Sequence, residues 1–270
     1  LDRSSAASDV YKRQVKEVLG GRLALSKTST KKYIAMLNCA AKDQRAHGLF
    51  QFYGANRTGR WSSRMIQLQN LPQNHMKDLD LARSMVEKGD YDLIEMCYGN
   101  IPNVLSELIR TAFIAPEGKM FAVADFSAIE ARVLSWLAQE KWRLDVFNTH
   151  GKIYEASASL MFGVPIEQVT KGSDLRQRGK TAELALGYEG SVNAMEKMDK
   201  EKKLSKKEMY SIVALWRRAN PKIVEFWAEV NEKAIECVQT RKTKKVSCLV
   251  FEHDGTNLTI ALPAGRKLYY

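Results

Sequence analysis

The fold is decided by one continuous stretch, Arg176-Gln177-Arg178-Gly179-Lys180-Thr181-Ala182-Glu183-Leu184-Ala185-Leu186-Gly187-Tyr188. We expect it to lie on a helix that covers residues 174–186. On such a helix, Arg176, Lys180 and Leu184 follow one another at i, i+4 steps, so two cations and an apolar side chain form one stripe. This stripe suits a nucleoside triphosphate, with the cations on the phosphates and the apolar surface against the base or sugar. On spacing alone, a basic, solvent-facing stripe is the commoner explanation.

A second informative stretch is Asp125-Phe126-Ser127-Ala128-Ile129-Glu130-Ala131-Arg132. The apolar residues 120–124 come directly before it and predict a short strand. A carboxylate at the end of a buried strand can bind the hard divalent cations that phosphoryl transfer needs. Ser127 and Glu130 have the spacing of a capping box at a helix start. Both acids therefore also have a structural explanation. Asp125 could simply end a strand, and Glu130 could simply be part of the helix cap.

A third stretch consists of Thr58-Gly59-Arg60-Trp61-Ser62-Ser63 and, further on, Gln67-Leu68-Gln69-Asn70-Leu71-Pro72. The glycines in residues 54–63 predict a structured loop whose backbone can approach another group closely. Arg60, followed by the amides of Gln69 and Asn70, suits the edges of a nucleic-acid minor groove, where every base pair presents acceptors. A turn with a solvated arginine is the alternative explanation.

Taken together and in this order, the three stretches resemble the motifs of family A DNA polymerases, the relatives of DNA polymerase I. The first resembles motif B, R-x-x-x-K-x-x-x-[FY]-G-x-x-Y, and the second resembles motif A, D-Y-S-x-I-E-x-R. The third resembles the T-G-R-x-S-S and N-L-Q-N-x-P signature. The resemblance extends over residues 15–270 and is to phage-encoded and phage-related members in particular.

This resemblance implies a two-metal phosphoryl-transfer site. Asp125 would bind both catalytic Mg²⁺ ions, with the backbone carbonyl of Phe126 as a further ligand. Glu130 would be the steric gate that blocks a ribose 2′-hydroxyl, the group that distinguishes RNA precursors from DNA precursors. Arg176 and Lys180 would hold the triphosphate of the incoming dNTP.

The resemblance also implies contacts to the base and to DNA. The residues expected at the dNTP are Phe126, Glu130, Leu184 and Tyr188. Tyr188 would pack near the templating base, and Arg60, Gln69 and Asn70 would contact DNA. Leu184 departs from the family pattern, which has Phe or Tyr at this position. We therefore expect sugars that lack a 3′-hydroxyl to be rejected.

The second catalytic carboxylate of the family comes from motif C, His-Asp-Glu, and the sequence contains no such triplet. Its only His-Asp pair is His253-Asp254, which is followed by Gly255. Asp-Gly is a strong turn signal, and residues 246–262 alternate like a hairpin around it. We therefore expect the chain to stop short of motif C and to lack the second carboxylate.

The fold class implied is α+β, mostly helical, in the form of a partial right-hand polymerase with thumb base, palm and fingers. The expected segments are a tail foreign to the native protein (1–14), the base of the thumb (15–50), the first part of the palm with motif A (51–135), the fingers with the motif B helix (136–240) and a hairpin that returns to the palm (241–270).

Composition limits the other possibilities. The 270 residues are 45% hydrophobic and include 42 Lys and Arg against 31 Asp and Glu, a formal net charge of +11. This composition is that of a globular protein, and the basic charge points to an anionic partner such as nucleic acid.

No apolar run approaches the roughly 18 residues of a membrane helix. The four cysteines and four histidines are scattered, which makes a zinc site improbable. We expect a monomer in the bacterial or infected-host cytoplasm, without membrane contact.

The function that these observations predict is template-directed DNA synthesis, in which a DNA-directed DNA polymerase adds dNTPs to the 3′-hydroxyl of a primer-template with Mg²⁺ as the cofactor. Two alternatives remain open. A single-subunit RNA polymerase shares relatives of motifs A and B, although Glu130 argues against it, since such an enzyme should have a small residue there. A non-catalytic module that binds DNA and nucleotide would fit a chain without motif C, and we expect little or no extension activity from this chain alone.

Overall fold

The computed structural model describes residues 12–22, 30–56, 58–199 and 204–270. The chain divides into two compact units, Leu1–Ala122 and Val123–Tyr270. The expected tail, residues 1–14, lies outside the described residues except for residues 12–14, which are part of a helical segment over residues 12–22. The boundary between the units falls within residues 51–135, the expected first part of the palm. The assignment of segments to thumb, palm and fingers stays a prediction.

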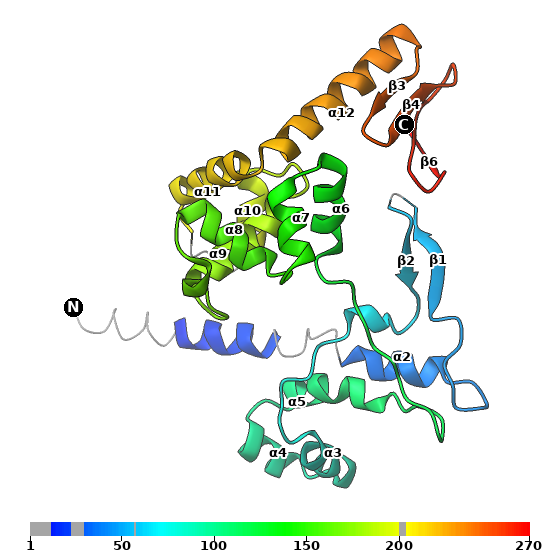
Figure 1. The fold of residues 1–270 in the computed structure, drawn as a ribbon. Coiled ribbons are helices and arrows are strands. Elements are labelled where there is room, and N and C mark those ends of the chain that lie inside the picture. The colour runs from blue at the N-terminus through cyan, green and yellow to red at the C-terminus, as the bar shows by residue number, and fades with distance from the viewer. Residues whose placement is uncertain (1–11, 23–29, 57, 200–203) are drawn as a thin grey trace. The chain divides into compact units, whose positions relative to one another are not determined.

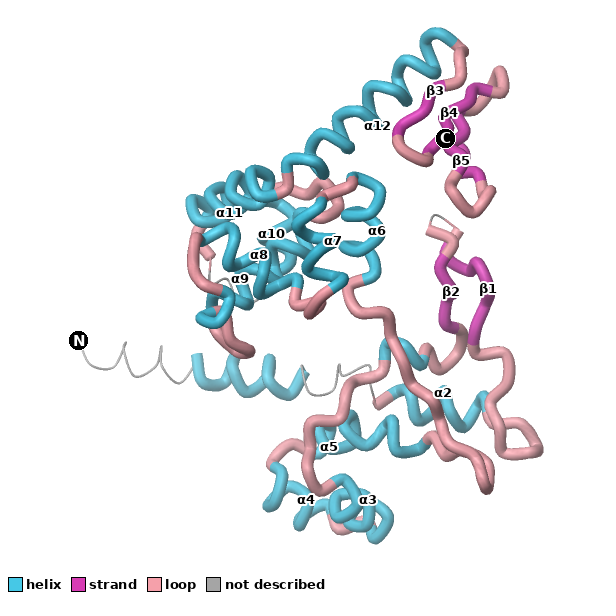
Figure 2. The backbone as a smooth tube through the Cα atoms, in the orientation of Figure 1, coloured by secondary structure: helices cyan, strands magenta, loops and turns pink. Residues whose placement is uncertain are grey.

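The first unit is mostly helical, with one small hairpin (Figures 1 and 2). Its helices and strands are α2 (Lys31–Cys39), β1 (Phe50–Ala55), β2 (Arg60–Ser63), η1 (Leu68–Asn70), α3 (Leu79–Lys88), α4 (Tyr91–Tyr98), α5 (Ile101–Leu108) and η2 (Ile109–Ala112). One apolar cluster forms where α3, α4 and α5 pack around the fully buried Ala82 and Ile94. A second cluster surrounds Ile66 and Ile109.

Of the glycine-containing residues 54–63, for which the sequence predicted a loop, residues 56, 58 and 59 form a turn, and residues 54–55 and 60–63 belong to the strands on either side of it. Strands β1 and β2 pair in antiparallel fashion, with an irregularity in register between Gln51 and Ala55. Gly54 lies so close to Ser62 on the opposite strand that a Cβ at this position would overlap that side chain. The loop prediction therefore holds for the turn and was wrong for the two ends, because glycine permits close cross-strand packing as well as a turn.

The strand predicted for residues 120–124 is not formed. These residues are irregular in the structure, and the large side chains of the segment are exposed, including 90% of Val123 and 79% of Phe126. A strand requires a neighbouring backbone for its hydrogen bonds, and none of the described residues pairs with this segment. The prediction took an apolar run to be buried, but burial depends on residues elsewhere in the chain.

The capping box predicted at Ser127 and Glu130 is also absent. Helix α6 begins at Ile129, its N-cap residue is Ala128 in a left-handed conformation (φ 50°), and no side chain caps it. A capping box forms instead at the start of α11, between Ser205 and Glu208. Glu130 nevertheless lies in the first turn of α6, where a carboxylate interacts favourably with the helix dipole.

The second unit consists of a helical body followed by a small antiparallel sheet. Its elements are α6 (Ile129–Ala138), α7 (Lys141–Asn148), α8 (Ile153–Phe162), η3 (Ile166–Gln168), α9 (Asp174–Leu186), α10 (Val192–Met198), α11 (Lys206–Ala219), α12 (Pro221–Thr240), β3 (Lys244–Val246), β4 (Leu249–His253), β5 (Leu258–Ala261) and β6 (Lys267–Tyr269). The predicted helix over 174–186 is confirmed as α9.

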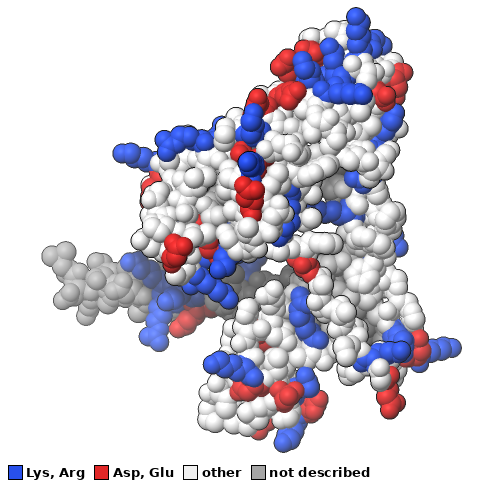
Figure 3. Space-filling view, viewed as in Figure 1, with Lys and Arg blue, Asp and Glu red and all other residues white. Residues whose placement is uncertain are grey.

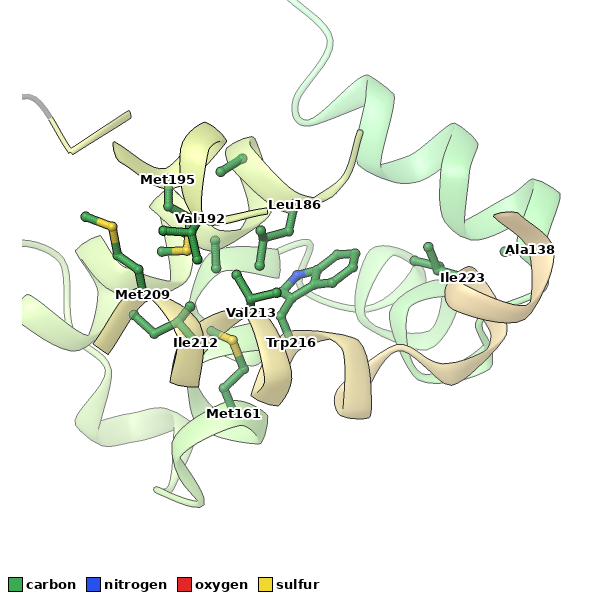
Figure 4. Close-up of a cluster of buried hydrophobic side chains, with 12 residues drawn as sticks. Ala138, Met161, Leu186, Val192, Met195, Met209, Ile212, Val213, Trp216 and Ile223 are labelled. Carbon is green, nitrogen blue, oxygen red and sulfur yellow. The ribbon is translucent and has the colours of Figure 1, made fainter. Parts of the chain in front are cut away.

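The core of the helical body is centred on Trp216 of α11, whose side chain is fully buried (Figure 4). Leu186 of α9, Met195 of α10 and Met161 of α8 belong to the same cluster. The ring of Trp227 on α12 stacks on Trp216, with 5.9 Å between ring centroids. This core holds α9 against the neighbouring helices, so the face of α9 that carries the predicted site is attached to a packed body.

The predicted hairpin near the C-terminal end is confirmed and belongs to a sheet of order β3-β4-β5-β6. His253 pairs with Leu258, so the loop between β4 and β5 covers residues 254–257 and is longer than the two-residue turn that Asp254-Gly255 suggests. One face of the sheet packs on α12 through Phe251 and its neighbours. Along the described part of the chain, no helix is both long enough and apolar enough to cross a membrane.

Candidate functional site

Helix α9 carries the stripe that the sequence predicted. Its N-cap is Ser173, whose hydroxyl accepts a hydrogen bond from the backbone N–H of Arg176 at 3.3 Å. The helix then runs without interruption through Lys180 and Leu184. Arg176 and Lys180 are half-buried and 40% of Leu184 is exposed, so the stripe lies at the surface of the unit. The two cations and the apolar residue therefore do share one face.

A glycine on the adjoining face of α9 brings this helix into close contact with α8. A Cβ at Gly179 would overlap the backbone carbonyl of Tyr154 and would lie 2.9 Å from the Cβ of Ala158. Only a residue without a side chain permits this spacing. The close approach places Tyr154 directly beside the Arg176 side of α9.

The cations of the stripe differ in their surroundings. The Nε of Arg176 donates to Glu155 at 2.6 Å, and its guanidinium lies 5.7 Å from the ring centroid of Tyr154. Burial works against ionisation of Glu155, but hydrogen bonds from Arg176 and from its own backbone outweigh this and lower its pKa. Across the described residues, no carboxylate lies within ion-pair distance of Lys180.

A small pocket of about 50 Å³ joins motif A to motif B. The predicted site residues that line it are Glu130, Leu184 and Tyr188, and Tyr154 forms part of the wall. Burial raises the pKa of the Tyr154 hydroxyl, and the charges of Glu183 and Glu130 raise it further, while Arg176 lowers it. Tyr154 therefore lies close to both Glu130 and Arg176 and connects the pocket to the stripe.

Arg176 does not line this small pocket. It borders a wider one, of about 470 Å³, over the first turn of α9, together with Ser173 and Thr181. The structure thus brings Glu130, Leu184 and Tyr188 together and leaves Arg176 on the adjoining surface.

The floor of the small pocket is a buried ion pair that the sequence analysis missed. Arg143 of α7 and Glu183 of α9 both line the pocket, and their side chains are only 1% and 2% exposed. The guanidinium of Arg143 donates from both terminal nitrogens to the Glu183 carboxylate. The only signal in the sequence was an acid between the small and apolar residues of a helix, and nothing in it identified a partner 40 positions away.

Asp125 and Phe126 lie in the irregular, exposed segment before α6. Among the described contacts, none joins Asp125 to Arg176 or to Lys180. The carboxylate of Asp125 and the carbonyl of Phe126 are hard oxygen donors, which are the ligands that Mg²⁺ prefers. No group of three or more His, Cys, Asp or Glu suited to a metal ion occurs within the described ranges.

The carboxylate of Asp254 is engaged in hydrogen bonds within its own turn. It accepts hydrogen bonds from the backbone N–H groups of Thr256, at 2.9 Å, and Asn257, at 2.7 Å. These bonds lower the pKa of Asp254, as expected for an acceptor of backbone N–H groups. The interpretation of Asp254 as a turn residue is therefore confirmed.

The residues predicted to contact DNA all lie in the first unit and are exposed. Arg60 is the first residue of β2, and Gln69 and Asn70 lie in η1. An aromatic pair on the same hairpin was not expected from the sequence. Phe52 and Trp61 are 71% and 59% exposed, and their rings meet edge to face with centroids 5.3 Å apart.

Comparisons with known proteins agree with these observations. Residues 11–255 match the family model of DNA polymerase family A. The chain is 54% identical over 258 residues to a DNA polymerase of Bacillus phage SP02, an alignment that covers 95% of this chain and 40% of that polymerase. It is 33% identical over 126 residues to the thermostable DNA polymerase I of Thermus aquaticus, which covers 46% of this chain and 14% of the relative. The chain therefore spans less than half the length of these relatives.

A solved structure with a similar fold is the POL domain of Pol1 from M. smegmatis, in complex with DNA primer-template and dNTP. The TM-score is 0.56 at 23% sequence identity, and the match covers 87% of this chain and 32% of that chain. This likeness confirms the expected fold, a mostly helical part of a polymerase domain.

Proposed function

The chain belongs to DNA polymerase family A, and on that basis we propose that it takes part in template-directed DNA synthesis. The substrates are a primer-template and dNTPs. The observation that supports this proposal most strongly is the shared pocket of Glu130, Leu184 and Tyr188, because it joins motif A to motif B beside the cationic stripe of α9. The phage relative is named a DNA polymerase.

The cationic stripe has the chemistry of a triphosphate site. In this proposal Arg176 and Lys180 neutralise and orient the phosphates of the incoming dNTP, a contribution of the positioning kind. Among the described residues, Lys180 forms no ion pair with a carboxylate, so a phosphate would not have to displace one. Arg176 donates to Glu155 through its Nε, which leaves the two terminal nitrogens of its guanidinium as donors for a phosphate.

The small pocket has the chemistry of a sugar and base site. Glu130 lies on one wall and would exclude a 2′-hydroxyl, while Leu184 and Tyr188 present apolar surface from the opposite element. The pocket holds only one or two water molecules, at about 30 Å³ each, so the sugar and base would rest over it. Leu184 in place of an aromatic residue supports the proposed rejection of sugars that lack a 3′-hydroxyl.

Family A polymerases depend on metal ions. For this chain we propose that the ion is Mg²⁺ and that the carboxylate of Asp125 and the backbone carbonyl of Phe126 bind it. Mg²⁺ is commonly bound by one or two carboxylates together with substrate phosphates and water, which this donor set fits. When bound, the ion supplies positive charge to the phosphates and favours ionisation of the primer 3′-hydroxyl. Asp125 is exposed, so its carboxylate is accessible to a metal–dNTP complex.

We place the DNA contact on Arg60, Gln69 and Asn70. The β1–β2 hairpin and its loop, residues 50–64, contain no acidic residue. The structural neighbour was solved with primer-template and dNTP, which supports the same partners here. On the face drawn in Figure 3, Lys and Arg side chains are spread over both units with Asp and Glu interleaved, so the net charge of +11 is not confined to one patch.

A second candidate is a module that binds DNA and dNTP without turnover. The turn role of Asp254 favours it, because the described part of the chain also contains no group of three or more His, Cys, Asp or Glu suited to a metal ion. We further propose a monomer in the cytoplasm of a bacterium or an infected host cell.

Binding and primer extension should be measured on the same chain with Mg²⁺. The proposed function requires that a fluorescent dNTP and a primer-template bind, and that Arg176→Ala and Lys180→Ala weaken dNTP binding. Lys233→Ala removes a cation of α12 and should leave it unchanged. Primer extension by the wild type that is lost in Asp125→Ala would establish that the chain is an active polymerase. Binding of both ligands without extension would establish the non-catalytic binding module. Failure to bind either ligand, or a preference for NTPs over dNTPs, would overturn the proposal.

A further inference from the structure

The buried pair of Arg143 and Glu183 is the centre of a polar network that joins several helices. The Nε of Arg143 donates to Ser135 of α6 at 2.8 Å, and a terminal nitrogen donates to Asn220, between α11 and α12, at 3.0 Å. Glu183 also accepts from the indole N–H of Trp216 on α11 at 2.8 Å. One ion pair on α7 and α9 is thereby fixed to α6, to α11 and to the junction of α11 and α12.

Stability alone does not explain why this network is present. Removing two charges from water is costly, and buried ion pairs can often be replaced by apolar residues without loss of stability. Their best-established advantage is specification of one arrangement among several. Arg143 is suited to specifying one arrangement, because its planar guanidinium binds a carboxylate through two parallel hydrogen bonds and so fixes the relative orientation of the two side chains.

The position of Glu183 on α9 shows which arrangement is specified. Gly179 and Glu183 are four residues apart, so they lie on one face of the helix. Gly179 is pressed against α8, and Glu183 is held by α7 and α11. Two anchors on one face fix the rotation of the helix about its axis. That rotation determines where the neighbouring stripe and Leu184 point.

We propose that Arg143 and Glu183 are positioning residues that fix the rotation of α9 and thereby set the geometry of the pocket that receives the dNTP. Both line the floor of the pocket whose walls include Glu130, Leu184 and Tyr188. A change in the pair would therefore reach the walls directly. The inference rests on the proposed function for its ligand, but its mechanical part concerns this chain alone.

The test uses the double variant Arg143→Met/Glu183→Leu, which replaces both charges by apolar groups of similar size. We expect it to fold with a somewhat lower melting temperature than the wild type, because the buried indole N–H of Trp216 and the amide oxygen of Asn220 lose their partners. Its affinity for a fluorescent dNTP should fall by about 10- to 100-fold, since small misplacements of a binding group have effects of this size. Amide hydrogen exchange in residues 184–188 should become faster, because the last turn of α9 loses its anchor.

Two further variants keep the result interpretable. Arg143→Lys retains the charge but loses the fork, so it should fold and still bind dNTP more weakly than the wild type. Lys233→Met removes an ion pair from α12, outside the pocket, and should change neither dNTP affinity nor exchange in residues 184–188.

The outcomes separate the two proposals. A stable double variant with wild-type dNTP affinity and wild-type exchange would overturn the positioning role and leave the proposed function intact. If the double variant does not fold, full dNTP affinity in Arg143→Lys overturns the positioning role. A wild-type chain that binds no dNTP would overturn the proposed function, and hydrogen exchange would still decide whether the pair fixes α9.

Discussion

Helix α9 and the segment before α6 each contain a motif of the polymerase family, yet they are held in opposite ways. The buried face of α9 has Gly179 packed on α8 and Glu183 inside a polar network. The segment of residues 120–126 is irregular, and its apolar side chains, such as Val123, are exposed. A helix satisfies its own backbone hydrogen bonds and needs only packing from its neighbours. An extended segment needs another backbone as well.

The largest loss of stability should come from removing one partner of the buried pair of Arg143 and Glu183. Arg143→Ala leaves the Glu183 carboxylate buried without its cation and should lower the free energy of unfolding by about 3–5 kcal/mol. Urea denaturation monitored by tryptophan fluorescence would measure it. The exposed pair of Arg13 and Glu17 provides the comparison, and Arg13→Ala should leave the midpoint nearly unchanged. A small effect of Arg143→Ala would mean that α9 is held by apolar packing alone.

The next effect concerns the close approach of α8 and α9. Gly179→Ala places a methyl group against the backbone of Tyr154 and should destabilise the protein by about 1–3 kcal/mol. Gly20→Ala is the matched control, because Gly20 lies in a helical segment where an added methyl group would meet no described atom within 4 Å, and alanine favours helices. The control should be neutral or stabilising. Equal behaviour of the two variants in thermal unfolding would contradict the close packing.

A smaller effect should appear as a pH dependence of the ion pair on the stripe. Arg176 lowers the pKa of Glu155 below the ordinary value of 4.5, so the folded state binds this proton less readily than the unfolded state does. The stabilisation is complete above that ordinary value and is lost as the pH falls through the lowered pKa. Between about pH 6 and pH 3 the wild type should therefore lose more stability than Glu155→Gln. Parallel pH profiles of the two proteins would show that the pair contributes nothing.

The smallest effect is expected on the exposed segment. Val123→Ala and Phe126→Ala remove side chains that are 90% and 79% exposed, so each should change stability by no more than about 0.5 kcal/mol. Thermal unfolding of the two variants beside Arg143→Ala would compare the two regions directly. A loss of several kcal/mol in either would mean that the segment packs against other residues, and the contrast with α9 would disappear.

Predictions from the sequence succeeded where structure is local. The helix over residues 174–186 has the expected bounds, because helical hydrogen bonds join residues four apart and the sequence pattern shows them directly. The turn at Asp254 follows for the same reason, since its side chain bonds to backbone groups two and three residues on.

Predictions failed where a distant partner decides. The two ends of residues 54–63 are strands and not loop, because Gly54 packs against Ser62 on the opposite strand. Residues 120–124 did not become a strand, because no described backbone pairs with them. The capping box at Ser127 did not form, and its spacing could not reveal that the N-cap is Ala128, one residue later.

The amino-acid sequence by itself determined the family, the order of its motifs and the stripe on α9, because each depends on which residues occupy fixed positions along the chain. Only the tertiary structure decided that Glu130 shares a pocket with Leu184 and Tyr188, and that Arg143 meets Glu183 beneath it. Such pairings depend on how helices pack in three dimensions. The physical reason is that burial and charge pairing are properties of neighbours in space, which spacing along the chain does not specify.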